Sequence, residues 1–258
     1  MYVFTVCLAG IPVEIRCRYE ENRIFLKDYL TDRDPLLTIE PSADDLEQIQ
    51  EGLNRMDEAE KFPKRRRPES FLENNAIHAL LAEKLVDHNV LLMHGSALCM
   101  DGKAYIFTAA SGTGKSTHAR LWREVFGDRI WMINDDKPML RIEESGVTVW
   151  GTPWDGKHRL SRNASARLHA IIRLVRSKEN RMTSMSKAEA FPVVMAQTFA
   201  SDHPAAMMHI VQLETQLLDA VDFYTLECNM NPEAAETAWE TLKGPSLPPG
   251  SGYSSEPA

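Results

Sequence analysis

The chain has 258 residues, of which 43% are hydrophobic and 26% charged, so it is long enough and apolar enough to fold around a full core. Lys and Arg number 29 against 37 Asp and Glu, and this net charge of −8 argues against non-specific binding to nucleic acid or to an acidic membrane. No apolar run approaches the roughly 20 residues of a membrane span, no signal peptide is visible and the four cysteines lack metal-ligand spacing, so we expect a cytoplasmic protein with reduced thiols.

The first 89 residues are expected to form a small α+β lobe that carries no identifiable motif. Residues 3–8 and 11–17 alternate as strands do, and the turn between them predicts a hairpin. A capping-box pattern, Ser42 followed by Asp45, predicts the start of a helix. The apolar face of this helix would be formed by Leu46, Ile49, Leu53 and Met56.

A second helix of the lobe is predicted to begin with the capping pair Ser70 and Glu73 and to stop near Asn89. Between the two helices, the segment KFPKRRRP (61–68) breaks the helical pattern and is the best candidate for a linker. Its basic run, 64–67, is most simply an exposed and solvated surface, and a docking patch for a partner is the alternative.

The second part of the chain, 90–243, is expected to be an α/β core. Residues 90–99 and 104–109 predict the two strands of a hairpin, and 115–126 predict a helix. Further strands are predicted at about 129–134, 138–143, 147–152, 166–175 and 222–228, with helices at about 186–199, 204–220 and 231–242. The final segment, 244–258, is rich in Pro, Gly and Ser and predicts a disordered tail.

The most informative stretch is AASGTGKST (109–117), a glycine-rich loop between an apolar strand and a helix. In P-loop proteins such a loop closes its backbone N–H groups around phosphates, and the N-terminus of the next helix adds a partial positive charge. Lys115 is placed to reach the β- and γ-phosphates, and the Ser116 hydroxyl to bind Mg²⁺. Ala109 stands where the strict pattern has its first glycine. The residues expected to hold the nucleotide are Ser111, Gly112, Thr113, Gly114, Lys115, Ser116 and Thr117.

Two adjacent carboxylates, Asp135 and Asp136, end an apolar strand downstream of the glycine-rich loop. In P-loop proteins a carboxylate at the end of a neighbouring strand holds Mg²⁺ opposite the loop hydroxyl. One Asp suffices for that role, and a second could accept the proton of an attacking hydroxyl, which favours transfer to an alcohol over hydrolysis. An exposed acidic turn is the plainer interpretation of the sequence N-D-D-K.

Two further groups give a weaker signal. His94 lies on the first strand of the predicted hairpin, where a histidine is most often a core residue, but antiparallel pairing would set it opposite the residues just before the glycine-rich loop. The segment GTPWDGKHRL (151–160) is dense in turn formers and carries Lys157, His158 and Arg159. These side chains could serve the transferring phosphoryl group or the acceptor, or could form an ordinary exposed basic loop.

Taken together, MHGSAL (93–98), SGTGKST (111–117) and the Asp135-Asp136 pair resemble the HPr kinase/phosphorylase and ATP-dependent phosphoenolpyruvate carboxykinase superfamily. The resemblance covers about residues 90–175. It implies an α/β fold, with a P-loop core whose mixed sheet is of that type, beside the small N-terminal lobe. Its cofactors would be ATP and Mg²⁺.

The resemblance also implies a role for each matching residue. His94 would lie at the metal and phosphate site, and Lys115 and Ser116 would keep their phosphate and Mg²⁺ roles. Of Asp135 and Asp136, one would be a metal ligand and the other the base that deprotonates an acceptor hydroxyl. The sequence does not assign the two roles between them.

The activity that the resemblance implies is a kinase with an alcohol acceptor, most simply a serine or threonine of a protein or peptide. Thr117 stands where HPr kinases have Glu, and residues 151–160 lie where they carry an E-I-R-G-L-G signature, so HPr itself is not the expected substrate. One alternative is a kinase for the hydroxyl of an amino acid, sugar or polyol. Another is a protein that senses a nucleotide without transferring its phosphate. Relatives of this family are often oligomers, and nothing in the sequence identifies an interface.

Overall fold

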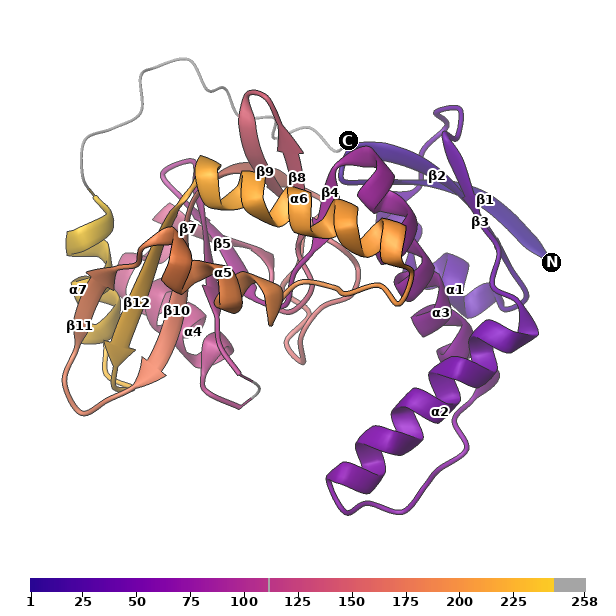
Figure 1. The fold of residues 1–258 in the computed structure, drawn as a ribbon, viewed down its shortest axis with the longest axis horizontal. Coiled ribbons are helices and arrows are strands. Elements are labelled where there is room, and N and C mark those ends of the chain that lie inside the picture. The colour runs from indigo at the N-terminus through magenta and orange to yellow at the C-terminus, as the bar shows by residue number, and fades with distance from the viewer. Residues whose placement is uncertain (111, 244–258) are drawn as a thin grey trace. The chain divides into compact units, whose positions relative to one another are not determined.

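The computed structural model describes residues 1–110 and 112–243, so Ser111 and the tail predicted for 244–258 lie outside the described residues (Figure 1). The chain divides into two compact units, Met1–Leu85 and Val86–Ala258, and each has its own β-sheet. Within the described ranges, no helix is both long enough and apolar enough to cross a membrane.

The first unit combines a three-stranded sheet with helices. Its elements are β1 (Tyr2–Leu8), β2 (Ile11–Cys17), α1 (Glu20–Phe25), the 3-10 turn η1 (Lys27–Tyr29), β3 (Leu37–Ile39), α2 (Ala43–Ala59) and α3 (Glu69–Lys84). β1 and β2 form the predicted antiparallel hairpin, and β3 pairs with β2 in parallel. The capping box at the start of α2 is confirmed, since Asp45 and Ser42 each accept a hydrogen bond from the other's backbone N–H. Met56 is 62% exposed, contrary to the prediction, because the apolar contact between α2 and α3 ends at Leu53.

Helix α3 begins differently from its prediction. It starts at Glu69, and no side chain caps its N-terminus. The Glu73 carboxylate instead accepts hydrogen bonds from the backbone N–H groups of Arg18 and Tyr19, at 2.8 and 3.2 Å, and from Nδ2 of Asn22, at 2.8 Å. The predicted capping box was therefore wrong, because a distant part of the chain recruits the carboxylate that would have closed it.

The second unit is built on a mixed sheet with the strand order β4-β8-β9-β10-β6-β5-β7, with β12 pairing to β10 and β11 to β12. Its strands are β4 (Val90–Leu92), β5 (Ser96–Met100), β6 (Lys103–Thr108), β7 (Ile130–Asn134), β8 (Met139–Glu143), β9 (Gly146–Trp150), β10 (Ser165–Arg176), β11 (Arg181–Ser184) and β12 (Asp222–Cys228). Its α-helices are α4 (Lys115–Phe126), α5 (Lys187–Met195), α6 (Pro204–Ala220) and α7 (Glu233–Leu242), and the 3-10 turns η2 (Leu85–His88) and η3 (Gly127–Arg129) precede β4 and β7.

Strand directions bring several strand ends to one edge of the sheet. β10 pairs in parallel with β6 and β12, and β5 is antiparallel to both β6 and β7. β6, β7, β10 and β12 therefore all run the same way. In open α/β sheets, ligands bind at the edge where parallel strands end.

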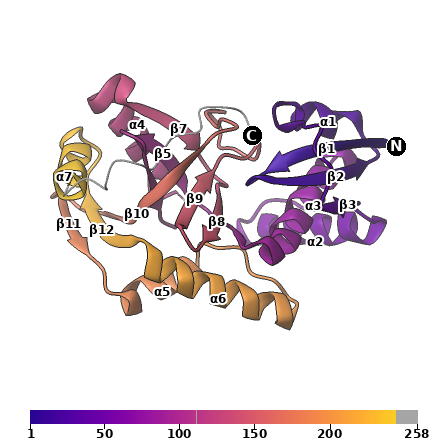
Figure 2. The same cartoon turned by 90° about the horizontal axis from the view of Figure 1, so that it is seen from above.

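The helices of the second unit cover both faces of the sheet (Figure 2). α5 and α6 pack on one face, where Val194 and Leu213 join a buried cluster with Ile171 of β10. α4 and α7 pack on the other, where Trp122 joins a second buried cluster with Ile172. Successive residues of β10 thus enter opposite layers, as the period of a strand requires.

The single strand predicted for 90–99 is wrong, because β4 and β5 are separate strands with different partners. Between them, the N–H groups of His94 and Gly95 donate to the carbonyls of Gln197, at 2.7 Å, and Asp136, at 3.1 Å. A Cβ at Gly95 would lie 2.7 Å from Cγ2 of Ile106. The chain therefore leaves the β-sheet pairing at Gly95, where the backbone lies too close to β6 for a side chain to fit.

His118 makes the folding stability sensitive to acid. Burial lowers its pKa to about 3, while its Nε2 accepts a hydrogen bond from Trp122 at 3.0 Å. Between its ordinary pKa near 6.5 and about 3, the unfolded chain binds a proton that the folded chain does not. This residue should therefore reduce the free energy of unfolding by up to about 1.4 kcal/mol per pH unit as the pH falls through that window.

Urea unfolding of the wild type and of His118→Gln, between neutral pH and about pH 4, measures this contribution. We expect a shallower loss of stability in the variant. Parallel curves for the two proteins would contradict the assignment.

Candidate functional site

A glycine-rich loop joins β6 to α4 at the edge where the parallel strands end (Figure 1). Gly112 and Gly114 have φ values of +74° and +124°, which residues with a Cβ rarely adopt, so both positions favour glycine. The N–H of Thr113 donates to the carbonyl of Ala110 at 3.2 Å. The first N–H groups of any α-helix have no intrahelical partner, and in the described residues no side chain caps those of α4. These free donors form a site suited to an anion.

Lys115 is the first residue of α4 and is only 9% exposed. Its Nζ donates a hydrogen bond to the carbonyl of Ala109 at 3.0 Å, which folds the ammonium group back over the loop. Burial lowers its pKa; Asp136 and Asp135 oppose that effect, and Lys137 adds to it. The ammonium group therefore interacts electrostatically with both carboxylates that follow β7.

Asp135 follows β7 and is 4% exposed. Its Oδ1 accepts a hydrogen bond from the Ser96 hydroxyl at 2.8 Å. Burial raises its pKa; the Ser96 hydrogen bond lowers it, Asp155 raises it and a hydrogen bond from Ser116 lowers it. Gly156 closes the other side, because a Cβ there would lie 2.9 Å from Oδ2. The Ser96 hydroxyl therefore holds this buried carboxyl group, and the Ser116 hydroxyl acts on its pKa.

Asp136 differs from Asp135 in exposure and partners, with 36% of its side chain exposed. Its two oxygens lie 3.2 Å from Nε2 of His94 and 3.2 Å from Nζ of Lys137. Burial would raise its pKa, but the His94 hydrogen bond and the Lys137 charge outweigh this effect and hold the pKa at about 2. Asp136 is therefore an ionised carboxylate that solvent can reach.

Asn134, which the sequence analysis did not single out, organises both carboxylates. It is fully buried, and its Oδ1 accepts hydrogen bonds from the N–H groups of Asp136 and Lys137 at 2.8 and 2.6 Å. Its Nδ2 donates to the carbonyls of Thr152 and Trp154 at 3.0 and 3.2 Å. One side chain thus fixes the turn after β7 to the loop that follows β9.

We expect Asn134→Ala to lower the free energy of unfolding by about 3 kcal/mol, because it leaves several buried polar groups unpaired. Urea unfolding at neutral pH measures the loss. Asn163→Ala, in a partly exposed position, is the comparison variant. A loss below about 1 kcal/mol for Asn134→Ala would show that the network is not needed for stability.

The loop after β9 is tied to β7 by Asp155. Its carboxylate accepts hydrogen bonds from the N–H groups of Asp135, Gly156 and Ser161 at 3.0, 2.7 and 2.7 Å. The predicted cations Lys157, His158 and Arg159 are exposed on this loop. Of these three, His158 acts on Asp135 by lowering its pKa. Arg159 has a φ of +47°, in the left-handed region that residues with a Cβ seldom adopt.

Arg176, which the sequence analysis also missed, holds the glycine-rich loop from the end of β10. Its Nε donates to the carbonyl of Thr113 at 3.2 Å, and its Nη2 donates to that of Gly112. The sequence did show an arginine at the end of a long predicted strand. Its contact with the loop could be inferred only from the pairing of β10 with β6.

Two depressions flank the loop. An open one of about 700 Å³ is lined by Gly112, Thr113, Arg173, Arg176 and Gln197 among others. A more enclosed one of about 480 Å³ is lined by loop residues, Thr117 and apolar side chains including Leu121, Leu174 and Met230. Both lie at the edge where β6 and β10 end, so the loop has room for a ligand on either side.

The structure thus brings Lys115, Ser116, Asp135, Asp136 and His94 into one neighbourhood. In residues 1–110 and 112–243, no three His, Cys, Asp or Glu side chains form a group that could hold a metal ion.

Comparison with known proteins gives a distant likeness of fold. No protein-family profile matches the chain, and no curated protein matches it. Among 47 matching chains of solved structures is the Hpr(Ser) kinase/phosphatase from Coxiella burnetii, which is 12% identical, with a TM-score of 0.28. The match covers 50% of this chain and 88% of that one.

Proposed function

We propose that this protein is an ATP- and Mg²⁺-dependent kinase, distantly related to the HPr kinase and phosphoenolpyruvate carboxykinase superfamily, that phosphorylates a serine or threonine of a protein or peptide. The observation that carries the proposal is the meeting of two strand ends: β6 leads through the glycine-rich loop to Lys115 and Ser116, and β7 ends at Asp135 and Asp136. The effect of Ser116 on the pKa of Asp135, and that of both carboxylates on the pKa of Lys115, support one shared site.

The loop fits the phosphates of a nucleotide in two respects. Gly112 and Gly114 allow a backbone that turns N–H groups toward an anion, and the uncapped start of α4 adds further donors. Lys115 is buried beside these donors, and its present partner is one carbonyl, which a phosphate oxygen can replace. The enclosed apolar depression beside Leu121 and Leu174 suits the nucleoside.

Mg²⁺ prefers oxygen ligands and keeps several waters and phosphate oxygens around it, so it needs few protein ligands. We assign this role to Asp135 and to the Ser116 hydroxyl, which lies close enough to lower the pKa of that carboxyl group. His94 was predicted at the metal site as a ligand; its contact with Asp136 supports a positioning role instead. When bound, Mg-ATP supplies the electrophilic γ-phosphorus and charge neutralisation by the metal.

We assign the base to Asp136, because it is ionised and reachable from solvent. The Asp136 carboxylate would accept the proton of the acceptor O–H as that oxygen forms its bond to the γ-phosphorus and ADP leaves. His94 and Lys137 hold the carboxylate in place, and Lys115 offsets the negative charge on the transferring group. His158 and its neighbours are candidates for contacts with the acceptor.

The open depression beside the loop supports a peptide acceptor. It is lined by Gln197, whose carbonyl accepts the His94 N–H, and the His94 ring in turn contacts Asp136. An open depression admits an extended chain, whereas a kinase for a small molecule encloses its substrate. This geometry favours a peptide over an amino acid, sugar or polyol.

The test is transfer of label from γ-labelled ATP, with Mg²⁺, to a lysate of the source organism. Products are separated into protein and small-molecule fractions. The proposal is supported by label in protein that depends on Mg²⁺ and is released only by base, as from a phosphoserine or phosphothreonine ester. Label confined to small molecules selects the metabolite kinase, and nucleotide binding by calorimetry without any transfer selects the sensor.

A further inference from the structure

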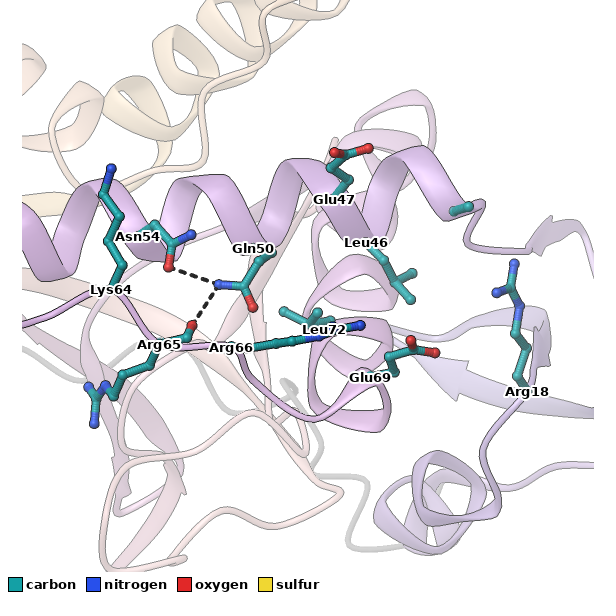
Figure 3. Close-up of a pocket in the computed structure, with 11 residues that line it drawn as sticks. Arg18, Leu46, Glu47, Gln50, Asn54, Lys64, Arg65, Arg66, Glu69 and Leu72 are labelled. Atoms are coloured by element: carbon teal, nitrogen blue, oxygen red, sulfur yellow. Dashed lines mark hydrogen bonds between the residues drawn. The ribbon is translucent and has the colours of Figure 1, made fainter.

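The first unit contains a depression that the proposed kinase chemistry does not use (Figure 3). Its volume is about 410 Å³, and it lies between α2, the start of α3 and the basic segment 64–66. The lining residues used in the argument are Arg18, Leu46, Gln50, Arg66, Glu69 and Leu72.

Gln50 of α2 fixes the basic segment against the helix. Its Nε2 donates to the carbonyl of Arg65 at 3.0 Å, and its Oε1 accepts the N–H of Arg67 at 2.9 Å (Figure 3 shows the first of these bonds). The same Nε2 lies 2.9 Å from Oδ1 of Asn54. The segment has no regular secondary structure, yet its backbone is held at two successive points, so the side chain between them has a defined direction.

The two arginines on either side of Arg66 share one acidic partner. Asp57, which is 6% exposed, lies 3.3 Å from Arg65 and 2.7 Å from Arg67. The hydrogen bond from Arg67 lowers the pKa of Asp57 most, against the opposing effect of burial, and the bond from Arg65 lowers it further. Arg66, by contrast, lines the depression, and its side chain extends toward Leu72 (Figure 3).

Arg66 and Arg18 reach the depression without a partner. Among the described residues, neither guanidinium group has a hydrogen bond or an ion pair, and both side chains are on exposed residues. The floor between them is apolar, because Leu46 and Leu72 form a cluster between α2 and α3. Two unpaired guanidinium groups beside an apolar floor are the complement of carboxylates that flank an apolar side chain.

We propose that this depression is a docking site for an acidic peptide segment of a partner protein, whose carboxylates pair with Arg18 and Arg66 and whose apolar side chain covers Leu46 and Leu72. Glu47 and Glu69 also line the site, so a peptide must place its carboxylates at Arg18 and Arg66 and away from these two side chains. The site is independent of nucleotide binding and of phosphoryl transfer.

The experiment measures binding of the full chain to the fluorescein-labelled peptide acetyl-Glu-Glu-Leu-Glu-Gly-Leu-Glu-Glu by fluorescence anisotropy. We expect saturable binding that weakens as salt is added, and a Kd raised about tenfold by Arg66→Glu and by Arg18→Glu. Arg55→Glu, an exposed charge reversal on α2 outside the depression, is the matched control and should bind as the wild type does. Circular dichroism and thermal melting confirm that each variant is folded.

Two additional probes test whether binding requires carboxylates and whether the ligand is a peptide. The same peptide with Gln in place of every Glu should bind at least about tenfold more weakly. A labelled single-stranded oligonucleotide that binds more tightly than the acidic peptide would overturn the peptide assignment. Absence of saturable binding by the wild type, or an equal effect of Arg55→Glu and Arg66→Glu, would overturn the site.

Discussion

Replacing Lys115 with Ala is expected to lower phosphoryl transfer by at least about 10³-fold while leaving the chain folded. The ammonium group is nearly buried, donates to the loop carbonyl of Ala109 and interacts with Asp135 and Asp136. A charge held in a protected site stabilises the transition state far more than a solvated one, because no water has to reorganise around it. The measurement is the initial rate at which label from γ-labelled ATP enters the acceptor fraction.

Lys103→Ala is the matched control, because Lys103 begins β6 at the end opposite to the glycine-rich loop. It should transfer label as the wild type does. Lys115→Ala is also examined by nucleotide-binding calorimetry, in which we expect weakened but measurable binding. Transfer by Lys115→Ala within about tenfold of the wild-type rate would rule out the proposed phosphate site.

The variants Asp135→Asn and Asp136→Asn are expected to fail for different reasons. Asp135→Asn removes the charge beside Ser116, so half-maximal activity should need about 10- to 100-fold more Mg²⁺. Asp136→Asn removes the acceptor of the proton, so kcat should fall by about 10²- to 10⁴-fold with little change in nucleotide affinity. Titrations of rate against Mg²⁺ concentration and calorimetry with ATP separate the two effects.

Asp128→Asn removes an exposed carboxylate between α4 and β7 and serves as the control. If the two effects are exchanged, Asp136 is the metal ligand and Asp135 the base. An unchanged Mg²⁺ requirement in Asp135→Asn, together with a near-normal kcat in Asp136→Asn, would refute the metal and base assignments.

The sequence was most informative where structure is set locally. The segment that leads from β6 through the loop into α4 was predicted well, and the observed α4 has the predicted bounds 115–126, because apolar spacing and two glycines decide it within a few residues. The antiparallel pairing expected to bring His94 near the loop is also seen, as the Thr108 hydroxyl donates to the His94 carbonyl at 3.0 Å. The roles proposed for the site residues stay predictions.

The sequence was least informative where contacts join distant positions. Neither β11 nor β3 was predicted, because each is short and depends on a partner strand, β12 and β2 respectively. Asn134 and Arg176 were missed for the same reason, since the partners Thr152 and Thr113 lie in loops far along the chain. Glu73 shows the converse: it fits a local capping-box pattern, but its carboxylate instead binds Tyr19 and the neighbouring residues.

The hold of Arg176 on the loop has a consequence for biosynthesis. Arg176 follows Thr113 by 63 positions, and the strand that carries it must pair with β6 before its guanidinium group can reach the loop carbonyls. During synthesis, the whole glycine-rich motif therefore leaves the ribosome well before Arg176, the residue that holds it. A fragment that ends ahead of β10 would contain the whole nucleotide-binding motif and would lack Arg176, which holds the loop carbonyls.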